Sequence, residues 1–394
     1  MGVATGVGGA LLTLLLHLTQ HAVFGVVGAT FAQEVREAAP VRRLVGMTIG
    51  GGAVGVAWWQ LRRRFVLVTV RTALADPPTR LPLRSTTLDA VTQIVAVGAG
   101  ASLGREGAPR QLAAAIAEVI SARLGLDGAH RRVLLGCAAG AGLAALYNAP
   151  VAGGLFTSEI VLATVDYVAL SAAALTSCIA VVVAWPVVGR SAIYQLGTHS
   201  TAPGVWLWAV LAGPVCTVAG RGFVWLMDRA RRGSPQRPTR VLPIHVMGAM
   251  AAVGAVAMVL PGVTGNGKSV LEALVGRGGL PAGVLIALLV AKPVTTALCL
   301  RGGLIGGLIT PSMATGGALG ALVAVALGHT QGGVTMIVCA MVGAAAMLAT
   351  TQNAPIMAGA FMLEVSQSPP ALWPPVAIAV LGVWVTTRVW RSPR

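Results

Sequence analysis

The chain has 394 residues, of which 56% are hydrophobic and only 10% are charged. Soluble domains carry roughly 45–50% apolar and about 25% charged residues, so the composition excludes a large water-soluble domain and predicts an all-α integral membrane protein. The net charge is +16, and the basic residues form short clusters between apolar runs. That pattern is typical of cytoplasmic loops and argues against nucleic-acid binding.

Apolar runs recur along the whole chain, and a membrane helix needs about 20 mostly apolar residues. The first run has no basic residues before it, so it predicts a membrane helix and not a cleaved signal peptide. We expect a single transmembrane domain, residues 1–394, with membrane segments near 5–30, 41–61, 87–103, 109–124, 131–146, 149–164, 166–188, 204–227, 241–260, 281–301, 312–328, 332–350, 355–366 and 372–390.

The charge of the connecting loops predicts which side of the membrane each one faces. The loops at 71–86, 125–132 and 229–240 are basic or proline-rich and are expected to be cytoplasmic. The loops at 189–203 and 261–280 carry little charge and are expected outside.

One motif occurs twice. Residues 148–160 read NAPVAGGLFTSEI, and residues 353–365 read NAPIMAGAFMLEV. The repetition predicts two related halves, roughly 1–228 and 241–394, joined by the basic loop 229–240. Membrane proteins use such repeats in inverted topology, with sites where broken helices meet. Glu159 and Glu364 hold equivalent positions and are expected to cap backbone groups or pair with arginine.

One glycine-rich loop in each half opens a predicted helix. Gly104-Arg105-Glu106-Gly107 precedes a helix expected near 108–109, and residues 306–311, GGLITP, open the helix at 312–328. Free N–H groups at a helix N-terminus carry partial positive charge and can hold an anion weakly enough to release it. We predict an anion site built from these residues: Gly104, Arg105, Gly107 and the backbone N–H groups of Leu308 and Ile309. Arg105 is expected mainly to bond carbonyls or a neighbouring carboxylate.

Glu106 stands at the mouth of the first of these helices. Its carboxylate is itself an anion and can occupy the site meant for one, and protonation or displacement by an anion would move it away. This predicts a gate. The simpler interpretation is an N-terminal charge favoured by the helix dipole. We prefer the gate because an ionisable residue between glycines in a membrane run is a functional hypothesis by default.

These motifs, with AKPVTTALC at 291–299 and Gly265-Asn266-Gly267, resemble in their order the motifs of the CLC family of voltage-gated chloride channels and chloride/proton exchangers. The resemblance implies a homodimer in the cell inner membrane. Each subunit would have one pore and would be an inverted repeat of tilted and broken transmembrane helices. It assigns Glu106 to the external gating glutamate, and Leu308 and Ile309 to the amides that line the central chloride site. It implies a bacterial-type member that has no regulatory C-terminal domain and needs no cofactor beside the transported chloride.

Two residues that the family pattern provides are missing from their expected places. A Gly-Ser-Gly-Ile-Pro type loop with a chloride-binding serine is expected near 64–68, where the chain reads RFVLV. The family's last helix supplies a chloride-coordinating tyrosine, but no tyrosine follows Tyr194. The inner part of the pore is therefore expected to be wider, weaker or inactive.

The residue after Glu159 separates two functions. Exchangers of the family resemble one another in carrying a proton-transfer glutamate at this position, and here it is Ile160, which cannot carry a proton. This favours a passive gated chloride channel. A chloride/proton antiporter remains an alternative, since exchangers can lack that carboxylate, and so does a degenerate family member without transport.

Neither an enzyme nor a metal site is predicted. The six histidines and five cysteines are dispersed, and HExxH, GxSxG and Walker patterns are absent. His17 and His21 share a helix face but have no third ligand nearby in the sequence.

Overall fold

We describe the chain from a computed structural model, which covers residues 1–25, 30–76, 78–164, 166–194, 202–235, 239–275, 279–329 and 333–391. Within these residues the chain forms helices and no β-strand. The predicted all-α class is therefore confirmed. Parts of some predicted segments lie outside the described residues: 26–29, 195–201, 236–238, 276–278 and 330–332.

The helices in chain order are α1 (Gly2–Phe24), α2 (Phe31–Glu37), α3 (Pro40–Arg64), α4 (Val70–Ala75), α5 (Leu83–Gly98), α6 (Gly107–Arg123), α7 (Gly128–Tyr147), α8 (Pro150–Phe156), α9 (Tyr167–Val188), α10 (Pro203–Arg232), α11 (Leu242–Val259), α12 (Lys268–Val275), α13 (Ala282–Arg301), α14 (Ile309–Ala326), α15 (Val334–Gln352), α16 (Pro355–Ser366) and α17 (Trp373–Arg391). A π-helical turn, η1 (Thr157–Leu162), extends α8, and the short 3-10 turns are η2 (Pro261–Val263) and η3 (Pro370–Leu372).

Nine helices among the described residues are long and apolar enough to cross a membrane. Their outward side chains include Leu11, Ile49, Leu175, Val210 and Ile286, all exposed, and apolar residues along a helix of this length suit contact with lipid. The chain is therefore a multi-pass integral membrane protein. The helices after the two Asn-Ala-Pro motifs, α8 with η1 and α16, are shorter than a full span, as the broken-helix prediction requires.

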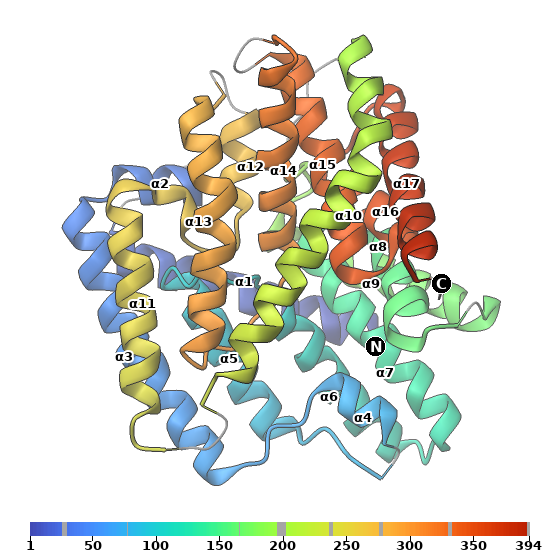
Figure 1. The fold of residues 1–394 in the computed structure, drawn as a ribbon. Coiled ribbons are helices and arrows are strands. Elements are labelled where there is room, and N and C mark those ends of the chain that lie inside the picture. The colour runs from blue at the N-terminus through green and yellow to red at the C-terminus, as the bar shows by residue number, and fades with distance from the viewer. Residues whose placement is uncertain are drawn as a thin grey trace.

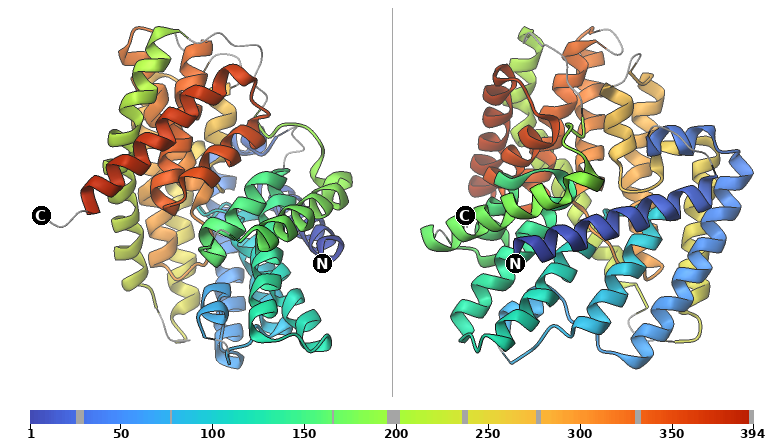
Figure 2. Two further views of the ribbon diagram at one scale, coloured as in Figure 1. Left: turned by 90° about the vertical axis from the view of Figure 1, so that its right-hand side faces the viewer. Right: turned by 180° about the vertical axis from the view of Figure 1, so that it is seen from behind.

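Helices from distant parts of the chain lie side by side. In Figure 1, α3 and α11 run along one edge, and α14 and α15 lie next to α10 and α17. Helix α1 runs across the molecule at a large angle to the upright helices, as the right view of Figure 2 shows. It packs on α5, α7 and α9. This interleaving brings the loops before α6 and α14 together inside the bundle.

Small residues let α14 and α15 approach closely. A Cβ atom at Gly316 would overlap the backbone of Gly343, and one at Gly320 would overlap the backbone of Cys339. Helices in a bilayer associate largely through such van der Waals contact. These two glycines therefore serve helix packing.

The two Asn-Ala-Pro motifs have the same backbone conformation. Asn148 and Asn353 each end a helix in the left-handed region, both with φ of 53°, which asparagine tolerates better than most residues. Pro150 and Pro355 each begin the next helix, a position that suits proline. The repeated sequence thus encodes a repeated turn.

Glu159 and Glu364 connect these two motifs reciprocally. Each carboxylate accepts hydrogen bonds from the first turn of the other half's helix, which confirms that they cap backbone groups. The four bonds run to Glu364 from Val151 N (2.9 Å) and Ala152 N (2.6 Å), and to Glu159 from Ile356 N (3.4 Å) and Met357 N (2.8 Å). Such reciprocity is what an inverted repeat with an approximate two-fold axis produces.

The helix boundaries differ from the predicted ones in three ways. The first helix ends at Phe24 and not at residue 30, because Gly25 takes a left-handed conformation with φ of 72°. Helix α10 continues to Arg232, so the predicted link at 229–240 begins within a helix. The short helices α2, α4 and α12 lie in predicted loops, since segments of this length carry little periodicity.

Candidate anion site

The two glycine-rich loops meet inside the helix bundle. Gly104 N donates to Gly307 O, and Gly307 N donates to Gly104 O, both at 2.8 Å. This pair is an isolated antiparallel bridge between the two halves of the chain. It fixes the start of α6 against the start of α14.

Glu106 lies at the N-terminus of α14 and is completely buried. Its Oε1 accepts a hydrogen bond from Ile309 N at 2.7 Å, and its Oε2 accepts one from the Tyr147 hydroxyl at 3.2 Å. Ile309 is the first residue of α14, and unpaired N–H groups there favour negative charge. The carboxylate thus occupies the position in which the sequence predicts an anion.

The backbone donors come from a segment with apolar side chains. Leu308 directly precedes α14, and the side chain of Ile309 is buried. Of the two predicted donors, Ile309 N makes the contact with Glu106. The negative charge of Glu106 is therefore stabilised here by a peptide N–H group and the helix dipole.

Glycine is required on both sides of the carboxylate. A Cβ atom at Gly104 or at Gly307 would overlap the Glu106 carboxylate itself. At Gly107, a Cβ would lie 2.8 Å from Gln93 Oε1. The glycines of these loops thus leave room for a negatively charged group close to the backbone.

Arg105 does not make all the contacts expected of it. Its guanidinium carbon lies 5.5 Å from the ring centroid of Tyr147, but its buried Nε has no hydrogen-bond partner among the described residues. The sequence predicted bonds to carbonyls or to a carboxylate. The observed neighbour is an aromatic face, which attracts a cation through its quadrupole.

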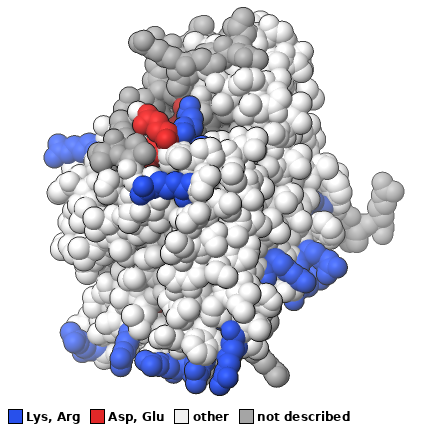
Figure 3. Space-filling model, turned by 90° about the vertical axis from the view of Figure 1, so that its left-hand side faces the viewer, with Lys and Arg blue, Asp and Glu red and all other residues white. Residues whose placement is uncertain are grey.

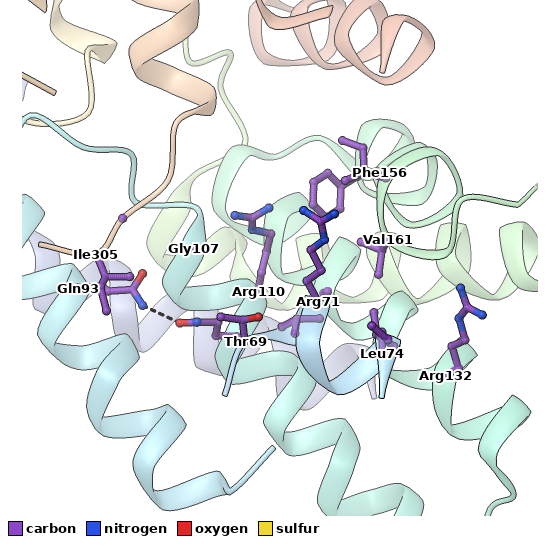
Figure 4. Close-up of a pocket in the computed structure, with 16 residues that line it drawn as sticks. Thr69, Arg71, Leu74, Gln93, Gly107, Arg110, Arg132, Phe156, Val161 and Ile305 are labelled. Carbon is purple, nitrogen blue, oxygen red and sulfur yellow. Dashed lines mark hydrogen bonds between the residues drawn. The ribbon is translucent and has the colours of Figure 1, made fainter. Parts of the chain in front are cut away.

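Two cavities are lined by chain neighbours of Glu106. The first, about 620 Å³ and here called the histidine cavity, is lined by Leu14, Leu16, His17, Leu18, Gln20, His21, Thr30, Phe31, Glu34, Val97, Arg105, Asn266 and Lys268. The second, about 510 Å³ and here called the arginine cavity, is lined by Thr69, Val70, Arg71, Leu74, Ala75, Gln93, Gly107, Arg110, Gln111, Arg132, Ala139, Phe156, Ile160, Val161, Ile305 and Gly306 (Figure 4). Arg105 lines one and Gly107 the other, so the two chain neighbours of the buried Glu106 border different cavities.

A hydroxyl group lies close to the position at which the expected chloride-binding serine is missing. The family serine is indeed absent from 64–68, but Thr69 follows directly and lines the arginine cavity. Its Oγ1 accepts from Thr72 N at 3.1 Å and caps α4. The sequence did not predict this hydroxyl group, because Thr69 begins a short helix that was itself not predicted.

Tyr147 was also missed. It is the last residue of α7 and is buried, and its hydroxyl reaches Glu106 across 41 positions of the sequence. Its place directly before the Asn-Ala-Pro motif was the available signal. It supplies a second donor to the carboxylate, from the other side of the site.

A buried carboxylate on α5 supports the wall of the arginine cavity. Asp89 accepts from Trp58 Nε1 and from Gln93 Nε2, both at 2.8 Å. Gln93 Nε2 also donates to Gln111 Oε1 at 2.6 Å, the dashed bond in Figure 4. These bonds hold Gln93 beside Gly107.

Ile160 lines the arginine cavity, whereas its neighbour Glu159 points to the start of α16. The position at which the family resemblance predicts a proton-transfer glutamate in exchangers is therefore apolar at the cavity wall. His17 and His21 both line the histidine cavity. Over the described part of the chain, no three His, Cys, Asp or Glu side chains are grouped to hold a metal ion.

A bundle of membrane-spanning helices that directs a helix N-terminus at a buried negative group has what an anion transporter or channel needs to hold an anion within the membrane. Residues 52–387 match the family model described as voltage gated chloride channel, and the chain belongs to this family. The resemblance to CLC proteins is thereby confirmed. Members of this family transport anions across membranes, and the chain is an inner-membrane, multi-pass protein of this kind.

Curated relatives carry both channel and exchanger names. A Ralstonia nicotianae protein named putative chloride channel protein ClcB-like is 30% identical over 324 residues, covering 79% of this chain and 74% of the relative. The Citrobacter koseri voltage-gated ClC-type chloride channel ClcB is 26% identical over 361 residues, 90% and 86% of the two chains. The Cronobacter sakazakii H(+)/Cl(-) exchange transporter ClcA is 30% identical over 306 residues, 73% and 63%.

Solved structures agree with the fold. A slow cyanobacterial Cl⁻/H⁺ antiporter superposes with a TM-score of 0.81 at 20% identity, covering 99% of this chain and 93% of the other. A eukaryotic CLC transporter gives 0.72 at 19% identity, covering 99% and 71%. The fold is therefore the CLC arrangement of tilted and broken helices.

Proposed function

We propose that this protein is a passive chloride channel with Glu106 as its gate. The observation that carries the proposal is the bond between Glu106 Oε1 and Ile309 N, 2.7 Å long, at the N-terminus of α14. In the closed state the carboxylate fills the anion position between the two cavities. Chloride, or protonation of Glu106, releases the side chain, and the vacated N–H groups then hold the ion briefly. Gly104, Arg105 and Gly107 form the rest of this site with Leu308.

Passive flow is supported by Ile160, which borders the arginine cavity and has no group that can carry a proton. Glu159, its neighbour, is committed to capping α16. The antiporter is a second candidate, because one relative is named an exchange transporter. A family member without transport is the third.

The arrangement in the membrane follows from the charge distribution. Figure 3 shows lysine and arginine side chains gathered along the lower edge of the molecule beneath a largely uncharged surface. By the positive-inside rule that edge faces the cytoplasm. We propose further that two copies form a homodimer with one pore each, and that each copy consists of the halves 1–228 and 241–394.

Flux through chloride-loaded liposomes tests the proposal. Purified protein with a potassium ionophore should release chloride without moving protons, which a pH electrode in the same vessel records. Glu106→Gln should give faster efflux that no longer depends on pH. Glu37→Gln, at an exposed carboxylate on α2, is the matched control and should behave as wild type. Protons driven uphill would support the antiporter. No efflux from either wild type or Glu106→Gln would support a family member without transport.

A further inference from the structure

The arginine cavity carries positive charge without a matching acid. Its lining includes Arg71 from α4, Arg110 from α6 and Arg132 from α7, and none of the lining side chains is acidic. In the view of Figure 4 the side chains of Arg71 and Arg110 both extend toward the side of the cavity where Phe156 lies. Arg71 and Arg132 are exposed, whereas Arg110 is partly buried and is attracted by Glu106, which does not line the cavity. The cavity therefore offers three positive groups and no negative one, an arrangement that an anion can bind.

The guanidinium group of Arg110 is held in a fixed orientation at the cavity wall. Its Nε donates to the carbonyl of Glu106 at 2.8 Å, and its guanidinium carbon lies 5.0 Å from the ring centroid of Phe156. The helix and the aromatic ring therefore fix the plane of the guanidinium. Its two Nη groups have no protein acceptor among the described residues, and the same holds for the whole side chain of Arg71.

The chemistry of this pair discriminates between anions. A guanidinium offers parallel N–H donors in a rigid fork that matches two oxygens of one ligand, such as a carboxylate or a phosphate. Chloride has one centre, so both N–H donors must converge on it, and the match to the parallel fork is poorer. A cavity of about 510 Å³ is also far larger than a halide needs and lies in the range of small-molecule sites.

We propose that the arginine cavity is a binding site for a small oxyanion, held between Arg71 and Arg110 and preferred there over chloride. Because Arg110 also bonds the backbone of Glu106, the occupant lies on the direct route to the gate. It competes with chloride that enters from this side. Binding at this site is independent of whether the protein conducts, so the two proposals fail separately.

Protection from an arginine reagent tests the binding directly. The purified protein is treated with phenylglyoxal in nitrate, acetate, phosphate or chloride at matched ionic strength, and adducts are quantified by mass spectrometry. At least one oxyanion should slow modification of Arg71 and Arg110 by about fivefold more than chloride does. The three oxyanion arms tell which geometry and charge the site prefers. Arg64, an exposed residue at the end of α3 that does not line the cavity, should react equally in all salts.

A variant distinguishes one oxyanion bound by both Arg71 and Arg110 from general shielding of the arginines by salt. Arg71→Gln changes an exposed side chain and should abolish the oxyanion's protection of Arg110, whereas Arg64→Gln should preserve it. Equal protection by chloride and all oxyanions would overturn the proposal. So would protection of Arg64 to the same degree, or full protection of Arg110 in the Arg71→Gln protein.

Discussion

Replacing Glu364 by glutamine should destabilise the protein more than the same change at Glu159. Glu364 accepts two short bonds, 2.9 and 2.6 Å, whereas one of the two bonds to Glu159 is 3.4 Å long. A hydrogen bond to a charged group contributes about 1.5–3 kcal/mol. Glutamine keeps one acceptor oxygen and loses the charge, so Glu364→Gln should cost about 2 kcal/mol. Glu159→Gln should cost about 1 kcal/mol, because a 3.4 Å bond is already weak.

The free energies of unfolding can be measured by titrating detergent-solubilised protein with a denaturing detergent and following tryptophan fluorescence. Glu37→Gln, at an exposed position, should stay within about 0.5 kcal/mol of wild type. The reasoning is refuted if Glu159→Gln costs as much as Glu364→Gln. It is also refuted if Glu364→Gln cannot be distinguished from the control.

Three further changes test the contacts around the site. Gly307→Ala places a methyl group where the Glu106 carboxylate lies, so chloride flux in liposomes should lose its pH dependence; retained dependence would contradict the glycine argument. Tyr147→Phe removes the 3.2 Å bond to Glu106. A loss of about 1.5 kcal/mol should make the open state roughly tenfold more populated, measured as faster chloride efflux at neutral pH. Unchanged efflux would count against this bond. Lys292→Met removes the ammonium group that donates to Ser102 Oγ, Val263 O and Gly265 O. It should lower the free energy of unfolding by about 2–4 kcal/mol, measured in the same denaturing-detergent titration. An unchanged free energy of unfolding would contradict this prediction.

Features encoded in short stretches could be predicted from the sequence. The turn at Asn148 and Asn353 follows from residue types that accept a left-handed conformation before a helix-starting proline. The meeting of Glu106 with Ile309 followed from the order of the glycine-rich loops in two related halves, although 203 positions separate them. Membrane spans followed from run length.

Features that depend on tertiary packing could not be predicted in this way. Arg110 looks like one more basic residue in the first turn of a helix, and only the fold places it in a cavity without an acid. Tyr147 reaches Glu106 because α7 ends beside the start of α14. Thr69 belongs to a helix of six residues, too short for a periodic signal.

The central claim is that the Glu106 carboxylate occupies an anion site at the start of α14. Crystals of Glu106→Ala grown in bromide test it most directly, since bromide is located by its anomalous scattering. The expected result is an anomalous peak within hydrogen-bond distance of Ile309 N, with no such peak in wild-type crystals whose carboxylate is in place. An empty position at Ile309 N in the Glu106→Ala crystals would contradict the claim.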